Sequence, residues 1–492
     1  MSVPRVIIAG THSGCGKTSV TLAVMSGLQQ AGYRVQGFKV GPDYIDPSYH
    51  AVATGQPSHN LDDWMMGAEA VKWLLAETAC RSDIAVIEGV MGLFDGLDST
   101  TDEGSTAGMA KLIKAPVILV IDACSLARSV AALVKGYQTL DPDVGIAGVI
   151  FNRVGSPSHF RLLCEAVTHY NRIPVLGALP RDPQIHIPER HLGLKTASEN
   201  PQLHQCLKQL AQYTTRKPPL EGLGIDLERI VQISRLTQGD FASIEEDGFR
   251  ALHVLRENKQ GLSDEPKQRV RLAYALDRAF QFYYQVNLDF LERCGAELVP
   301  FSPLEDQKLP EGIGGLYFGG GFPEVYAQQL EKNASMRQSV LGAIHEGIPV
   351  YAECGGLMYL TKSLKTLNGE RFAMVGAVEG DIEMTDRLQN FGYCECEMVE
   401  DCFLGKKGER FRGHEFHYSR WDAEGTHPIH RVEKKRRNLS RSEGFRKGNL
   451  LASYVHCHFL SYPERAIALV EAAQNYCLKQ PTQESGRHAP IG

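Results

Sequence analysis

The feature that most constrains the fold lies near the N-terminus, where a short apolar stretch runs directly into a glycine-rich loop. Residues 6–9 are typical of a buried strand, and residues 10–19 read GTHSGCGKTS before a segment of helical character. A glycine-rich turn between a strand and a helix N-terminus points backbone N–H groups inward and adds the helix dipole, which together make an anion site. The sequence therefore predicts a phosphate-binding loop whose candidate ligands are Gly14, Gly16, Lys17, Thr18 and Ser19.

Two side chains of this loop have expected roles. Lys17 is placed to reach the outer phosphates of a nucleotide, and Thr18 is placed to put its hydroxyl on Mg²⁺. The usual pattern has glycine at position 11, whereas this chain has Thr11 there and Gly10 one residue earlier. A chance Gly-Lys-Thr is the alternative, but the strand–loop–helix setting favours a phosphate site.

Short apolar runs recur through the first part of the chain at intervals suited to strand–helix–strand units. They lie at residues 6–8, 35–38, 84–87, 117–121 and 148–151, with helix-like segments between several of them. This pattern predicts an α/β fold with a doubly wound, mostly parallel sheet and helices on both faces.

Acidic residues follow two of these strands. Asp43, Tyr44 and Asp46 come directly after one strand, Glu88 ends another, and Asp95 lies shortly beyond it. In open parallel sheets ligands bind beyond the carboxyl ends of the strands, so these side chains should converge on the phosphate loop. Mg²⁺ takes one or two carboxylates plus phosphate oxygens, and its candidate ligands are Thr18, Asp43 and Glu88. The alternative is that such residues only cap turns and helices.

A second α/β block follows a looser stretch, so the chain is expected to contain two domains. We expect a nucleotide-binding domain at 1–213, a linker with some helix at 214–268, a second α/β domain at 269–470, and a tail at 471–492 with a disordered end.

The second block contains a candidate nucleophile. Cys354 lies between an apolar run and a helix-like segment and is followed by two glycines, as in a strand-to-helix elbow that lowers a thiol's pKa. Gly320 and Gly321 follow another strand and could supply the N–H groups of an oxyanion hole. His456 ends a later apolar run, where a general base could reach the thiol. A small buried cysteine with no catalytic role is the alternative.

Composition narrows the class of protein. A net charge of −6 gives no basic footprint, so no nucleic-acid partner is expected. No apolar run approaches the ~18 residues of a membrane span, and no signal peptide is visible. The twelve cysteines are scattered without a CxxC pair, which favours reduced thiols in a cytoplasmic protein and disfavours zinc. The basic stretch 433–447 is expected to be a solvated loop.

In their order and combination these motifs resemble those of the cobyrinic acid a,c-diamide synthases, including the enzymes that act on hydrogenobyrinic acid. The resemblance runs from Val6 to about Pro463 and rests also on residues 412–419, RGHEFHYS. It implies an N-terminal domain like dethiobiotin synthetase, which shares the shifted phosphate loop, and a C-terminal class I glutamine amidotransferase domain.

The resemblance also implies the chemistry and the partners: ATP, Mg²⁺, L-glutamine and cobyrinic acid, in cobalamin biosynthesis. Cys354 would attack glutamine while His456 shuttles protons, and ammonia would pass internally to the ATP site. There the c-side and then the a-side acetate carboxylate would be amidated through acyl phosphates. By resemblance, Asp46 and Asp95 are candidate catalytic residues, Tyr44, Asp46 and Glu88 bind substrate, and Asn152 contacts adenine.

Several alternatives stay open. The macrocycle could be hydrogenobyrinic acid or nickel-sirohydrochlorin instead. A partition-type switch ATPase is disfavoured, because those proteins have a signature lysine where this chain has His12 and need no cysteine elbow. Many class I amidotransferases carry glutamate two residues after the catalytic histidine, where this chain has His458, so the third triad member is unassigned. Glu415 and His417 are noteworthy, and a structural role is equally expected; a homodimer is plausible for the family.

Overall fold

The computed structural model describes most of the chain as two compact units, which are treated separately. The described residues are 3–185, 187, 189–190, 193–194, 197–215, 223–237, 269–423, 427–434 and 439–480. The first unit comprises Met1–His253 with Tyr284–Val286, and the second comprises Val254–Tyr283 with Asn287–Gly492.

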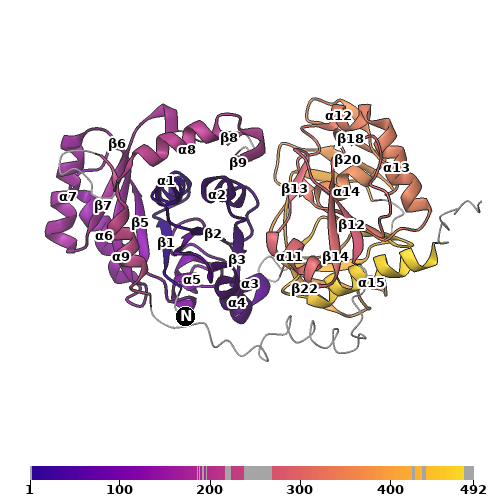
Figure 1. Ribbon diagram of the computed structural model, residues 1–492, viewed down its shortest axis with the longest axis horizontal. Coiled ribbons are helices and arrows are strands. Elements are labelled where there is room, and N and C mark those ends of the chain that lie inside the picture. The colour runs from indigo at the N-terminus through magenta and orange to yellow at the C-terminus, as the bar shows by residue number, and fades with distance from the viewer. Residues whose placement is uncertain are drawn as a thin grey trace, which may run out of the picture. The chain divides into compact units, whose positions relative to one another are not determined.

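In the described part of the first unit, nine strands form one sheet in the order β10-β11-β7-β6-β5-β1-β4-β2-β3 (Figure 1). Neighbouring strands are parallel except that β11 runs antiparallel to β7. A short antiparallel pair, β8 with β9, stands apart from this sheet. The strands are β1 (Arg5–Gly10), β2 (Val35–Val40), β3 (His59–Leu61), β4 (Ile84–Glu88), β5 (Val117–Asp122), β6 (Ile146–Val154), β7 (Val175–Pro180), β8 (Glu189–Arg190), β9 (Gly193–Leu194), β10 (Thr214–Thr215) and β11 (Ile225–Asp226).

Helices cover this sheet because its central strands are apolar on both faces. Alternate residues of a strand point to opposite faces, and Val6 and Ile8 of β1 pack in one core with Val20 and Val24 of α1. The helices are α1 (Lys17–Gln30), α2 (Asp46–Thr54), α3 (Asp63–Met66), α4 (Ala68–Ala79), α5 (Thr106–Leu112), α6 (Ser129–Leu140), α7 (Pro157–Asn171), α8 (Leu203–Gln212) and α9 (Leu227–Ser234), with 3₁₀ turns η1 (Pro183–Ile185) and η2 (Ala197–Glu199).

The first unit extends beyond residue 213, where the sequence places the start of a linker. The strands β10 and β11 join the sheet, and α9 buries Ile230 against the core that also holds Val6. The remainder of that expected linker, 216–222 and 238–268, lies outside the described residues.

The described part of the second unit is built on a six-stranded sheet in the order β14-β12-β15-β17-β27-β26, parallel except for the edge strand β26. An antiparallel sheet β25-β24-β21-β22-β28, a smaller sheet β19-β18-β20-β23 and the pair β13-β16 flank it. The strands are β12 (Val270–Ala275), β13 (Phe280–Phe282), β14 (Ala296–Phe301), β15 (Gly315–Phe318), β16 (Gly320–Gly321), β17 (Val350–Glu353), β18 (Ser363–Lys365), β19 (Arg371–Ala373), β20 (Asp381–Met384), β21 (Asn390–Met398), β22 (Arg410–His417), β23 (Ser419–Trp421), β24 (His430–Lys434), β25 (Leu439–Glu443), β26 (Phe445–Lys447), β27 (Leu450–Ser453) and β28 (His456–Cys457).

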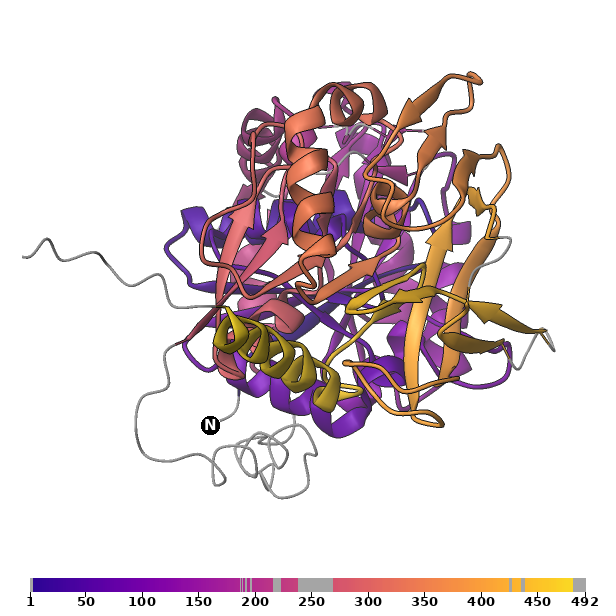
Figure 2. The same ribbon diagram turned by 90° about the vertical axis from the view of Figure 1, so that its right-hand side faces the viewer.

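Helices cover both faces of the six-stranded sheet as well. Residues of α12, α13 and α14 share one core with Leu316 and Ala352, whereas α15 contacts β12 and β15 and is the yellow helix of Figure 2. The helices are α11 (Gln285–Arg293), α12 (Ala327–Lys332), α13 (Ala334–His345), α14 (Gly355–Leu360) and α15 (Pro463–Lys479). The predicted α/β class is therefore confirmed for both halves of the chain.

Two local expectations differ from the structure. The first part of the expected tail is helical to Lys479, and only 481–492 lie outside the described residues. The basic stretch 433–447 is expected to be a loop, but it contributes to β24, β25 and β26, with 435–438 outside the described residues. Among the described residues no helix is long and apolar enough to cross a membrane.

Candidate active site

The glycine-rich loop lies between β1 and α1, as the sequence predicts, and its glycines fit positions that exclude a side chain. Gly16 has φ of 96° and stands immediately before α1, which begins at Lys17. A Cβ added to Gly10 would lie 2.4 Å from the Cys15 Sγ. The backbone N–H groups of the first turn of α1 therefore face the end of the sheet, which suits an anion.

The side chain of Asn152, on β6, contacts this loop and stabilises its conformation. Its side-chain Nδ2 donates to the Cys15 carbonyl at 3.0 Å, and the residue is buried. A Cβ on Gly16 would lie only 1.8 Å from that nitrogen. The amide group of Asn152 thus holds the loop, a contact that the sequence did not predict; its expected contact with adenine stays a prediction.

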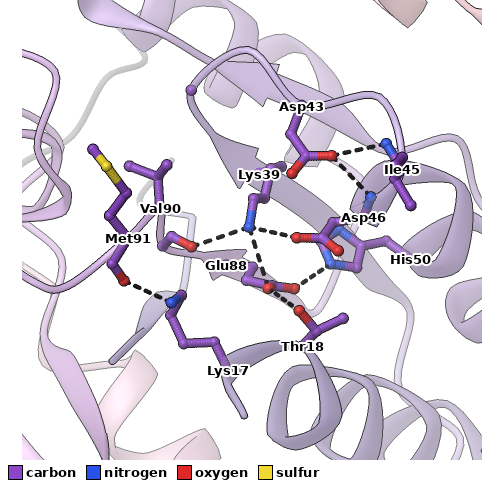
Figure 3. Close-up of polar contacts among 12 residues, drawn as sticks. Lys17, Thr18, Lys39, Asp43, Ile45, Asp46, His50, Glu88, Val90 and Met91 are labelled. Atoms are coloured by element: carbon purple, nitrogen blue, oxygen red, sulfur yellow. Dashed lines mark hydrogen bonds and ion pairs between the residues drawn. The ribbon is translucent and has the colours of Figure 1, made fainter. Parts of the chain in front are cut away.

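Lys17 points toward the loop that follows β4, and Thr18 points toward Glu88 at the end of β4 (Figure 3). The Lys17 ammonium donates to the Met91 carbonyl at 2.6 Å, and burial lowers its pKa. The Thr18 hydroxyl donates to Glu88 Oε1 at 2.7 Å. Ser19 follows on the same helix and is half-buried. Two of the expected metal ligands, Thr18 and Glu88, are therefore in direct contact.

Glu88 is the centre of a buried cluster of charged groups (Figure 3). Its carboxylate lies 2.8 Å from His50 Nε2 and 3.2 Å from Lys39 Nζ. Lys39 Nζ lies 2.6 Å from Asp46 Oδ2 and donates to the Gly89 carbonyl at 3.1 Å. Strands β2 and β4 and helix α2 bring these groups together at one end of the sheet.

Burial and neighbouring charges shift the pKa values of this cluster in opposite directions. Burial raises the pKa of Asp46 well above its usual value, with Asp43 and Glu88 adding to the effect and Lys39 opposing it. Burial would also raise the pKa of Glu88, but Lys39, His50 and the Thr18 hydrogen bond hold it below its ordinary value. Burial lowers the pKa of Lys39, yet the three carboxylates raise it overall. Two lysines, Lys39 and Lys17, thus act on these carboxylates, and the raised pKa of Asp46 favours its neutral form.

Oxygen atoms at this end of the sheet could contribute to a divalent cation site. Within the described residues no group of three or more His, Cys, Asp or Glu side chains is arranged to hold a metal alone. Mg²⁺ needs only one or two protein carboxylates when phosphate oxygens and water complete its shell. Thr18 and Glu88 offer such a partial set, and Asp43 lies in the adjacent loop, where its carboxylate accepts the backbone N–H groups of Ile45 and Asp46.

The other predicted residues of this site lie on the same two loops. Tyr44 is half-buried in the turn before α2, next to Asp43. Asp95 is exposed beyond β4, and its carboxylate accepts the Gly92 N–H at 3.0 Å. Sequence reasoning missed Lys39 and His50; the signal for Lys39 was a lysine in an otherwise apolar strand, VQGFKV.

The thiol of the second unit lies on a strained turn. Cys354 separates β17 from α14 with φ of 46° and ψ of −102°, and its N–H donates to the Ser453 carbonyl at 2.7 Å. Few non-glycine residues adopt a positive φ, and such strain is typical of a nucleophile elbow. His456, on β28, is hydrogen-bonded to Cys354. The structure thus brings together the two residues that the sequence predicts as nucleophile and base.

The protonated form of His456 is stabilised. Burial alone would lower the pKa of this imidazole, but the neighbouring Cys354 and Glu353 outweigh burial and raise the pKa to about 10. A histidine beside a cysteine at such an elbow is the arrangement of a nucleophile with its base.

The glycine loop after β15 lies against this pair. A Cβ on Gly320 would lie 2.5 Å from His456 Cε1, and one on Gly355 would lie 2.9 Å from the Gly321 nitrogen. Only glycine therefore permits this close approach, and the loop is suited to face an oxyanion formed at the thiol.

Glu415 and His417, which the sequence singled out without a role, make structural contacts. Glu415 is buried in ion pairs with Lys434 and Arg441. His417 stacks on Tyr454 with 3.8 Å between ring centroids. The contacts of Glu415 thus give it a structural role.

Comparison with known proteins agrees with this two-site arrangement. Residues 6–194 match the CobQ/CobB/MinD/ParA nucleotide binding domain, and residues 271–464 match the CobB/CobQ-like glutamine amidotransferase domain.

Similar full-length relatives are named cobyrinate a,c-diamide synthase. That of Caldanaerobacter subterraneus subsp. tengcongensis is 46% identical over 458 residues, 93% of this chain and 96% of the relative. That of Listeria innocua is 44% identical over 463 residues, 93% of this chain and 97% of the relative. That of Dehalococcoides mccartyi strain CBDB1 is 40% identical over 481 residues, 97% of this chain and the whole of the relative. With such identity over nearly the whole length, the chain belongs to the cobyrinate a,c-diamide synthase family.

Proposed function

We propose that this enzyme amidates the a- and c-acetate carboxylates of cobyrinic acid, using ATP to activate each carboxylate and glutamine as the source of ammonia. The observation that carries the proposal is the hydrogen-bonded Cys354–His456 pair at a strained elbow, in a chain that also has a phosphate loop beside buried carboxylates. A glutaminase site is useful in such a chain only if ammonia has an acceptor that ATP has activated.

At the thiol site, the Cys354 thiolate attacks the side-chain carbonyl of glutamine, and Gly320 and Gly321 face the resulting oxyanion. His456 gives its proton to the departing ammonia, and the bond from carbon to nitrogen breaks. His456 then takes a proton from water as the water attacks the thioester, which releases glutamate and restores the thiol.

At the phosphate site, a carboxylate oxygen of the macrocycle attacks the γ-phosphorus of ATP and ADP leaves. Ammonia then attacks the acyl phosphate, and inorganic phosphate leaves to give the amide. Activation is required because a carboxylate would otherwise have to expel oxide. Lys17 neutralises charge on the phosphates, and this kind of transfer depends mainly on positioning and electrostatics.

The remaining groups of this site have supporting roles. Thr18, Glu88 and Asp43 would hold Mg²⁺, which supplies further charge neutralisation on the phosphates when bound. Asp46 and Asp95 are the candidate catalytic carboxylates for the amidation step, and Tyr44, Asp46 and Glu88 are the candidate contacts to the macrocycle. Lys39 keeps Glu88 ionised, since the two groups are paired in the interior.

The test is an assay with the purified chain, ATP–Mg²⁺, glutamine and cobyrinic acid. Two successive conversions of carboxyl to amide by mass spectrometry, each with one ADP released, support the proposal. Cys354→Ala should abolish the reaction with glutamine and retain it with ammonium salts. If cobyrinic acid is untouched while glutamine is hydrolysed, the substrate is another macrocycle, and hydrogenobyrinic acid and nickel-sirohydrochlorin are then assayed in the same way.

A further inference from the structure

The position that usually holds the third member of an amidotransferase triad has no carboxylate in this chain. His458 stands two residues after His456, is fully buried, and burial lowers its pKa to about 3. A neutral imidazole there supplies no negative charge to stabilise a neighbouring imidazolium. His456 nevertheless has a raised pKa, to which Cys354 contributes first and Glu353 second.

A buried carboxylate lies beside His456 on a different strand. Glu353 Oε2 is 3.7 Å from His456 Nδ1, an ion-pair distance, and both side chains are about 2–3% exposed. Such catalytic contacts are often long in a free enzyme and tighten when substrate binds. Glu353 is the last residue of β17 and directly precedes Cys354.

Three donors hold this carboxylate in place. The Tyr351 hydroxyl donates to Oε1 at 2.7 Å, the Tyr317 hydroxyl donates to Oε2 at 3.0 Å, and the Cys457 N–H donates to Oε1 at 2.9 Å. Burial raises the pKa of both tyrosines well above their usual value, and Glu353 adds to the effect, so they remain neutral donors. The carboxylate is thus preorganised next to the histidine.

Apart from the nucleophile Cys354, the other described titratable groups around His456 do not supply an anion. His414 of β22 is paired in register with His456 of β28. Burial lowers the pKa of His414 to about 3, so His414 is uncharged. Cys354 also raises the pKa of His456, but it is the proposed nucleophile, and Gly320 brings no side chain. Within the described residues, Glu353 is the carboxylate in contact with the ring.

We propose that Glu353 is the positioning residue of the glutaminase site and replaces the missing third member of the triad. It accepts the Nδ1–H of His456, which leaves Nε2 for the thiol, and it stabilises the imidazolium formed when the thiol loses its proton. The inference rests on the proposed glutaminase role of Cys354. The strand-to-helix elbow therefore presents nucleophile and orienting carboxylate as consecutive residues.

The decisive variant is Glu353→Gln, which keeps an oxygen for the tyrosine and backbone donors but removes the charge. Its kcat for glutamine hydrolysis should fall roughly 10²- to 10⁴-fold while KM for glutamine changes less than about threefold. The basic limb of the pH–rate profile should move to lower pH, because His456 loses its stabilising anion. Glu383→Gln, an exposed glutamate paired with Lys365, is the matched control and should behave as wild type.

Alkylation of Cys354 by iodoacetamide separates positioning from a purely structural role. Glu353→Gln should slow alkylation at neutral pH about tenfold or more in the wild-type background, and should have no effect in a His456→Ala background. Equal slowing in both backgrounds, or a kcat within about threefold of wild type with an unshifted pH profile, overturns the proposal.

Ammonia-dependent amidation is the check on folding. If Glu353→Gln proves unfolded, Tyr351→Phe is the deciding variant, because it keeps the carboxylate and the aromatic ring but removes one hydrogen-bond donor. The proposal then expects a roughly three- to tenfold lower kcat at unchanged KM. A wild-type kcat for Tyr351→Phe overturns the proposal. If Cys354→Ala still hydrolyses glutamine, the proposed function fails instead, which is a distinguishable result.

Discussion

Replacing Gly16 with alanine should weaken nucleotide binding far more than it weakens the fold. Gly16 has φ of 96°, where an L side chain costs about 1 kcal/mol. A Cβ would also lie 1.8 Å from Asn152 Nδ2, so the amide must move and abandon the buried Cys15 carbonyl, at about 1–3 kcal/mol. Without ATP, the loop of the variant can change conformation and so avoid this cost. ATP binding requires the original loop conformation, so the cost appears as weaker binding. We therefore expect KM for ATP to rise roughly 30- to 700-fold, for a penalty of about 2–4 kcal/mol.

The assay is ADP release with ammonium salts as nitrogen source, so that the thiol site plays no part. Gly32→Ala is the matched control, because φ is 90° there but no atom lies within 4 Å of an added Cβ. It should cost about 1 kcal/mol of stability and leave KM for ATP within about twofold. A Gly16→Ala enzyme with the wild-type KM for ATP would refute the view that Asn152 supports the loop.

Two further predictions concern buried charge. Lys39→Met should lower the kcat of ammonia-dependent amidation by about 100-fold or more and lower Tm, because breaking a buried ion pair strands its partners; the exposed Lys365→Met should do neither, and equal losses would contradict the role of burial. His456 has a folded pKa of about 10 against 6.5 for the free side chain, so its contribution to stability is complete below about pH 6.5 and is lost as pH rises through 10. Urea unfolding between these pH values should therefore show a decline that His456→Ala lacks; parallel curves for the two proteins would count against the raised pKa.

The parts of the site that could be predicted from sequence are those built from consecutive residues. The phosphate loop and the cysteine elbow are local: a strand, a glycine turn and a helix are written in order along the chain. Asn152 also lies on a strand that the sequence predicts, but its contact with Cys15 spans 137 residues and depends on β6 lying next to the loop in the folded chain. Periodicity carries no information about such a contact.

The charged partners could not be read for the same reason. Lys39 meets Glu88 across 49 residues because β2 and β4 are neighbours in a sheet whose order departs from chain order. The expectation of a linker from residue 214 differed from the structure for another reason. The strands β10 and β11 have two residues each, which is too few to show an alternating pattern in the sequence.

In both sites a buried glutamate at the end of a strand pairs with a cation, and this pairing affects how each site tolerates substitution. Glu88 ends β4 and Glu353 ends β17, both are buried, and each holds a cation, Lys39 or His456, from another segment of the chain. In the interior an unpaired charge costs far more free energy than an ion pair contributes. A variant that keeps only one charge of the pair should therefore be less stable than a variant that lacks both. Glu88→Gln should accordingly recover part of the stability that Lys39→Met loses when the two are combined. Activity should stay low, because the double variant lacks the carboxylate that we propose as a metal ligand.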